Sequence, residues 1–122
     1  MTLSNYLQSQ ARWSIKTFGI GRRTKGICKH IQKELLEIQQ QPENTDEWID
    51  VIILGLDGYW RAGGTPESIM KDLQTKQNIN FLREYPFPTS EDEPSEHNRT
   101  EEIIGYESII QSIWRKFQKR NR

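Results

Sequence analysis

Two pairs of acidic residues recur at the same spacing, Glu34 with Glu37 and Glu47 with Asp50. Residues at i and i+3 of a helix have Cβ atoms roughly 5–6 Å apart, so each pair can present its carboxylates together. If the two helices pack against each other, the pairs form a cage of oxygen ligands. Mg²⁺ and Mn²⁺ prefer such ligands, and no Cys/His cluster indicates zinc. The pattern predicts a divalent-metal site; the alternative is solvated surface acids.

The helices that must carry these pairs are marked by local signals. We expect one helix over about 24–41, with Thr24 as its N-cap, and its end is marked by Pro42. We expect the next to begin after a cap at Asn44 or Thr45 and to end at the glycine pair that follows Arg61. The short connection between them predicts antiparallel packing.

The second of these helices has one polar line on an otherwise apolar surface. Four ionisable side chains fall within an arc of about 80°: Glu47, Asp50, Asp57 and Arg61. The opposite arc holds isoleucines, leucine and aromatic residues, so we expect this helix to be mostly buried. Carboxylates on a buried helix need cations, because an unpaired buried charge is costly. For Asp57, pairing with Arg61 and contact with a ligand remain alternatives.

The rest of the chain is predicted to be helical as well. We expect a helix over about 3–16 and another from Thr65-Pro66-Glu67 to about residue 84. The fold class is therefore all-α, an antiparallel helical bundle with an extra C-terminal amphipathic helix. We expect a main domain over 1–99, in which 84–99 is a Pro-rich acidic linker or clasp, and a basic amphipathic helix over 100–122.

Composition excludes several classes of protein. The 122 residues are 34% hydrophobic and 28% charged, and no apolar run approaches a membrane span. Lys+Arg and Asp+Glu are 17 each, so a global basic field is absent and nucleic-acid binding is not favoured. The small core favours a homo-dimer or dimer of dimers. The single cysteine, Cys28, which we expect to be buried, excludes an internal disulfide and fits the cytoplasm.

Two groups of cations could contact phosphates. Arg23 lies in a glycine-rich basic loop before a helix, a setting that suits an anion, although a flexible basic turn is the alternative. Further along, Lys76, Asn80 and Arg83 share one face of the fourth predicted helix. This face could open onto phosphates, or it could be a solvated helix end whose cations the helix dipole favours.

The residues around the acidic pairs resemble the motifs of a known family. The chain is similar to the all-α nucleoside triphosphate pyrophosphatases of the MazG-like superfamily, and within it to the phage and bacterial dATP/dGTP pyrophosphohydrolases of MazZ type. The similarity spans about residues 13–99, with Tyr85 where a Trp is more usual. It is carried by Phe18-Gly19-x-Gly21-x-Arg23-Thr24-x-Gly26, Lys33-Glu34-Leu35-x-Glu37, Glu47-Trp48-x-Asp50, Leu56-Asp57-Gly58, Trp60-Arg61-x-Gly63, Lys76-Gln77-x-x-Asn80-x-x-Arg83 and Glu96-His97-x-Arg99.

The resemblance implies that a deoxypurine triphosphate is cut to its monophosphate and pyrophosphate with Mg²⁺ or Mn²⁺. It implies metal binding by Glu34, Glu37, Glu47 and Asp50, with Glu34 or Glu37 also taking a proton from water. It implies substrate contacts from Arg23, Asp57, Arg61, Lys76, Asn80 and Arg83, of which Lys76 and Arg83 are also counted as catalytic. A pyrophosphatase for pyrimidine or damaged nucleotides, or a non-catalytic helical module that binds nucleic acid or a partner, is the alternative.

Overall fold

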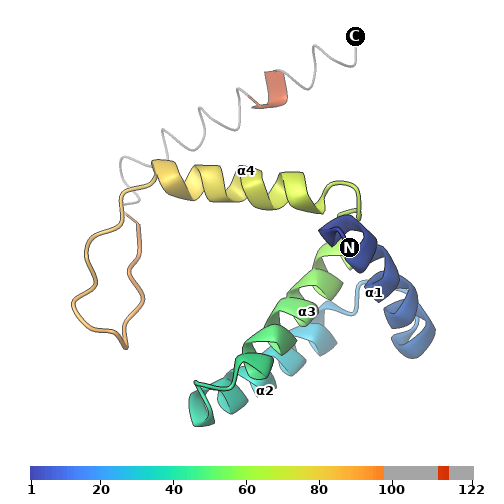
Figure 1. Ribbon diagram of the computed structural model, residues 1–122, viewed down its shortest axis with the longest axis horizontal. Helices are drawn as coiled ribbons and strands as arrows, with labels where there is room; N and C mark the ends of the chain where they lie inside the picture. Colours follow the sequence, from blue (N-terminus) through green and yellow to red (C-terminus); the bar gives the residue numbers. More distant parts are fainter. Residues whose placement is uncertain (98–112, 116–122) are drawn as a thin grey trace. The chain divides into compact units, whose positions relative to one another are not determined.

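The computed structural model describes residues 1–97 and 113–115 of the chain (Figure 1). Its helices are α1 (Leu3–Phe18), α2 (Thr24–Gln40), α3 (Thr45–Arg61) and α4 (Ile69–Leu82). The described residues contain no strand, which confirms the prediction of an all-α protein. None of their helices has the length and apolar character needed to cross a membrane. The predicted C-terminal helix lies outside the described residues, apart from a helical segment at 113–115.

The chain divides into two compact units, Met1–Lys71 and Asp72–Arg122. In the first unit α2 and α3 lie side by side as an antiparallel hairpin, and α1 packs on α3 (Figure 1). In the second, the end of α4 leads into a segment without helix or strand over 84–97. That segment is held by a hydrogen bond from Ser95 Oγ to the Pro86 carbonyl oxygen and by the ring contact of Tyr85 with His97, whose centroids are 5.8 Å apart.

Local capping explains where the helices begin. At the start of α1 the Thr2 side chain accepts a hydrogen bond from Asn5 N at 3.1 Å, and at the start of α3 the Asn44 side chain accepts one from Asp46 N at 3.1 Å. The prediction of Thr24 as an N-cap is wrong, because Thr24 is already helical and Arg23 occupies the cap position with φ 49°. There the glycine-rich loop turns through the left-handed region, so the helix starts without a side-chain cap.

The core of the first unit is small. Its buried apolar side chains are few: Leu7, Ile27, Ile38 and Ile69. The prediction that the third helix is mostly buried is wrong for the single chain. On α3 Trp48 is 52% exposed and Ile52 is 56% exposed, while the residues that are buried are Asp57 and Arg61. The main helices packed on α3 among the described residues are α1 and α2, and two helices leave part of a third uncovered.

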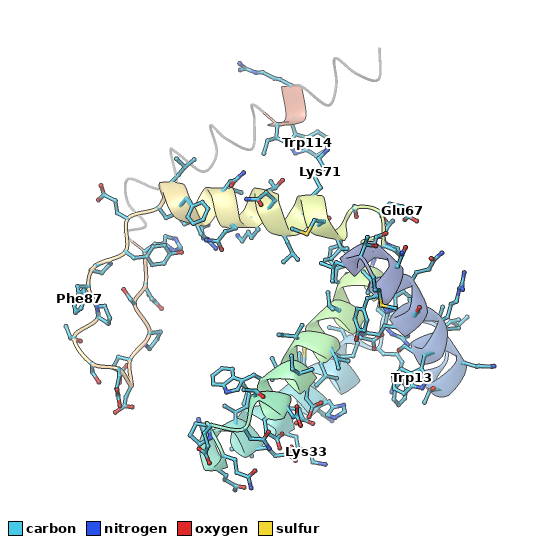
Figure 2. The ribbon with its side chains drawn as sticks, viewed as in Figure 1. Trp13, Lys33, Glu67, Lys71, Phe87 and Trp114 are labelled. Carbon is cyan, nitrogen blue, oxygen red and sulfur yellow. The ribbon has the colours of Figure 1, made fainter. Side chains whose placement is uncertain are left out.

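Several apolar side chains that are usually buried lie at the surface of the single chain. Trp13 on α1 is 56% exposed and Phe87, after α4, is 94% exposed (Figure 2). Cys28 is exposed, which corrects the expectation that it is buried: it follows the buried Ile27 by one position, about 100° further around α2. A chain with a thin core leaves much apolar area at its surface.

Candidate active site

The α2–α3 hairpin brings the acidic pairs together. Glu34, Glu37 and Glu47 each offer a carboxylate oxygen, and these oxygens all lie within 4.8 Å of one another. The antiparallel turn at residues 41–44 sets Glu47 of α3 opposite the last turns of α2. The structure therefore groups three of the four predicted metal ligands into what we call the carboxylate cluster. Asp50 is exposed at its edge and raises the pKa of both Glu34 and Glu47 through its charge.

The carboxylate cluster is short of positive charge and of hydrogen-bond donors. Glu34 is 7% exposed, and its Oε1 pairs with His30 Nε2 at 3.2 Å. The other oxygen of Glu34 and Oε2 of Glu47 are buried and accept no hydrogen bond from any described residue. Buried carboxylate oxygens without donors are rare because desolvation is costly. Such atoms fit a site in which a cation completes the coordination.

The pKa values point the same way. Burial raises the pKa of the Glu34 carboxyl, and the neighbouring carboxyls of Glu37 and Asp50 raise it further, against a lowering by His30. Burial is also the largest cause that raises the pKa of Glu47, and the neighbouring carboxyls of Glu37, Asp50 and Glu34 raise it further. Each carboxylate is destabilised by the others, and a divalent cation would relieve that repulsion.

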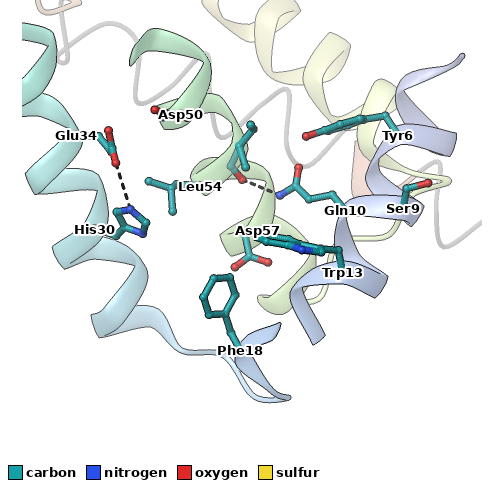
Figure 3. Close-up of a pocket in the computed structure, with 11 residues that line it drawn as sticks. Tyr6, Ser9, Gln10, Trp13, Phe18, His30, Glu34, Asp50, Leu54 and Asp57 are labelled. Atoms are coloured by element: carbon teal, nitrogen blue, oxygen red, sulfur yellow. Dashed lines mark hydrogen bonds and ion pairs between the residues drawn. The ribbon is translucent and has the colours of Figure 1, made fainter. Parts of the chain in front are cut away.

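A cavity of about 540 Å³ adjoins the cluster (Figure 3). All three helices of the first unit contribute to its wall, and its lining includes Tyr6, Gln10, Trp13, Phe18, His30, Glu34, Asp50 and Asp57. In Figure 3 Glu34, His30 and Asp50 lie on one side of the cavity, and Tyr6 and Gln10 extend from α1 on the other. Its volume lies within the range of small-molecule sites, about 300–1,000 Å³.

Asp57 and Arg61 form a buried ion pair at the C-terminal end of α3. Arg61 Nε donates to both Asp57 oxygens at 3.2 Å, and Trp60 Nε1 donates to Asp57 Oδ1 at 2.8 Å. The rest of the guanidinium holds the end of α1 and the loop after it: it donates to the carbonyl oxygens of Gly19 at 2.9 Å and Gly21 at 2.8 Å and to Ser14 Oγ at 2.8 Å. The pair thus joins α3 to the segment that carries two cavity residues, Trp13 and Phe18.

The remaining predicted residues lie in two places. Arg23 is in the loop before α2, with its guanidinium 5.0 Å from the ring centroid of Phe18. On α4, in the second unit, the carbonyl oxygen of the Asn80 side chain accepts from Arg83 Nη1 at 3.2 Å and from the Tyr85 hydroxyl at 3.4 Å. Lys76 is exposed on the same helix.

Sequence reasoning missed the contribution of α1 to the cavity. Gln10 and Ser14 are buried polar residues, 7% and 1% exposed, and both bond to α3. They follow Leu7 at helical spacing and so lie on its apolar face. Polar side chains at positions of a buried face were the sequence feature that could have indicated their role.

Comparison with known proteins supplies the family. No curated protein and no solved structure matches the chain. A family model described as dATP/dGTP pyrophosphohydrolase matches residues 6–104, which include most of α1, all of α2 to α4 and the whole carboxylate cluster. The chain therefore belongs to the dATP/dGTP pyrophosphohydrolase family and is an enzyme of that activity.

Proposed function

We propose that Glu34, Glu37, Glu47 and Asp50 bind a divalent cation, Mg²⁺ or Mn²⁺, at which the triphosphate is cut. The observation that carries the proposal is the meeting of three carboxylates within 4.8 Å, with two buried oxygens that accept no hydrogen bond from the described residues. Asp50 is included because it follows Glu47 by three residues on α3 and lines the adjoining cavity together with Glu34. Oxygen-only ligands suit these hard cations.

When bound, such a cation neutralises phosphate charge and lowers the pKa of water. The chain itself supplies the base. Glu34 and Glu37 are the candidates to accept the proton of the attacking water, since a carboxylate beside the bound water can act as a general base. The water oxygen bonds to one phosphorus of the α–β bridge as the bond from that phosphorus to the bridging oxygen breaks, and the two products are the monophosphate and pyrophosphate.

The substrate contacts fall on two elements. Around the cavity, Asp57 lines the wall and Arg61 fixes its orientation, while Arg23 stacks on the cavity residue Phe18. On α4 we assign Lys76 and Arg83, with Asn80 as their polar neighbour, to the phosphates and to the stabilisation of charge in the transition state. A triphosphate with its cation needs positioning and charge stabilisation more than covalent chemistry.

The oligomer is proposed from the surface of α3. Trp48, Ile49 and Ile52 are 52%, 48% and 56% exposed, and they recur on one side of that helix. Covering this side with a second copy of the chain would bury the apolar area that the small core leaves outside. We propose a homo-dimer or a dimer of dimers, located in the cytoplasm, where deoxynucleoside triphosphates are used. Light scattering on wild type and on Ile52→Glu tests the interface: the wild type should be an oligomer and the variant smaller.

A panel of deoxynucleoside triphosphates with product analysis tests the reaction. We expect dATP and dGTP to give the monophosphate and pyrophosphate, only in the presence of Mg²⁺ or Mn²⁺. Inorganic phosphate with a nucleoside diphosphate as the first products would refute the cut between the α and β phosphates. Faster turnover of pyrimidine or oxidised nucleotides would replace the proposed substrate and leave the metal site standing.

A further inference from the structure

The cavity beside the carboxylate cluster has an aromatic wall. The rings of Trp13 and Phe18 meet edge to face with centroids 5.4 Å apart, and they are 56% and 45% exposed. Both residues line the cavity. Aromatic faces at the edge of a cavity can contact a planar ring, but they do not by themselves distinguish one nucleobase from another.

Gln10 is the buried amide of this wall. It is 7% exposed, and its Nε2 donates to the carbonyl oxygen of Ile53 on α3 at 2.8 Å. That bond fixes which way the amide faces, because the nitrogen must point at Ile53. The opposite atom, Oε1, is buried and accepts no hydrogen bond from any described residue. A buried acceptor without a donor calls for an explanation, and a ligand donor in the cavity is one.

We propose that Gln10 is a specificity-determining residue whose Oε1 accepts a hydrogen bond from the exocyclic amino group of the purine, on C6 of adenine or C2 of guanine. The inference rests on the proposed function, since the phosphates must reach Glu34 and Asp50. Those carboxylates lie across the cavity from Gln10 (Figure 3), so one bound nucleotide can contact both sides. Thymine has no exocyclic amino group, so the acceptor selects against it, whereas cytosine, which carries an amino group on C4, is not excluded by this contact.

The test compares substrates that differ by that amino group. dATP is paired with the triphosphate of purine 2′-deoxyriboside, and dGTP with dITP. The ratio of kcat/KM within each pair is measured for wild type, for Gln10→Leu and for the matched control Gln8→Leu, which replaces an exposed glutamine of the same helix. Because each ratio is internal to one protein, it does not depend on the fraction of that protein that is folded.

We expect wild type and Gln8→Leu to prefer the amino-bearing nucleotide by at least about tenfold in one or both pairs, the size of one hydrogen bond in a desolvated site. Gln10→Leu should lower that preference to within about twofold. A preference that survives in Gln10→Leu, or that is absent from wild type, would overturn the inference while hydrolysis of dATP or dGTP still supports the proposed function. If wild type hydrolyses neither nucleotide, the proposed function fails and this inference fails with it.

Discussion

Replacing one carboxylate of the cluster by an amide should stabilise the metal-free protein and weaken its response to metal. Glu34 and Glu37 have oxygens within 4.8 Å. Coulomb's law puts their repulsion at about 1 kcal/mol in a water-like medium and about 3.5 kcal/mol at an effective dielectric constant of about 20. Since Glu34 is buried and Glu37 is half-buried, we expect Glu34→Gln to add about 1–3 kcal/mol to the free energy of unfolding.

The assay is thermal unfolding with and without a divalent cation. Without metal, Glu34→Gln should melt about 3–10 °C above wild type. With Mg²⁺ or Mn²⁺ at about 100 times the wild-type dissociation constant, wild type should gain about 2.7 kcal/mol and the variant far less, which removes or reverses the advantage of the variant. Glu43→Gln is the matched control because Glu43 is exposed in the α2–α3 turn, and its Tm should follow wild type under both conditions.

Two results would refute this reasoning. If metal-free Glu34→Gln melts at or below the wild-type temperature, the carboxylates do not repel one another in the folded chain. If the variant keeps the full metal-dependent rise in Tm, Glu34 is not a ligand. If both Glu34→Gln and Glu43→Gln melt below wild type with and without metal, any substitution in the α2–α3 hairpin destabilises the fold. The control Glu43→Gln is included to detect that case.

Four further outcomes are expected. The advantage of metal-free Glu34→Gln over wild type should shrink as the pH falls. Because the folded pKa of Glu34 is raised, wild type has its full stability below the ordinary value of 4.5 and loses stability as the pH rises through the folded pKa. Unfolding curves in which the advantage does not change with pH would contradict the charge repulsion. Glu47→Ala should lower kcat by at least ~10²-fold with weaker metal binding, and wild-type turnover would exclude Glu47 from the site. Lys76→Ala should lower kcat/KM by a factor equivalent to about 1.5–3 kcal/mol with little change in Tm. If Lys76 only contacts solvent, the replacement should change neither kcat/KM nor Tm. Arg61→Met should cost about 3–5 kcal/mol of stability because it leaves Asp57 buried without its cation, and Arg61→Lys should not restore it, since one ammonium cannot replace the fork of bonds to Gly19 and Gly21; chemical denaturation measures both.

The sequence by itself determined the helices and the spacing of the acids. The cap at Asn44, the stop at Pro42 and the amphipathic pattern act within a turn or two of the chain, so they can be recognised without the fold. For the same reason the i, i+3 pairs that hold Glu34, Glu37 and Glu47 were visible, and a hairpin of two adjacent helices was sufficient to bring them together. The family match over residues 6–104 agrees with that local information.

Tertiary structure decided everything that depends on distant contacts. Arg61 donates to carbonyl oxygens 40 and 42 residues earlier, contacts that its place in the helix pattern does not reveal, while its predicted contact with substrate stays a prediction. Gln10 has its Nε2 fixed by a carbonyl oxygen 43 residues later, which no periodicity predicts. The apolar surface of α3 was expected inside and is half exposed, because the two helices mainly packed on it in the described part of the chain leave one side uncovered. A pattern along one helix indicates which faces are apolar or polar, but the partner that covers each face is set by the packing of the whole chain.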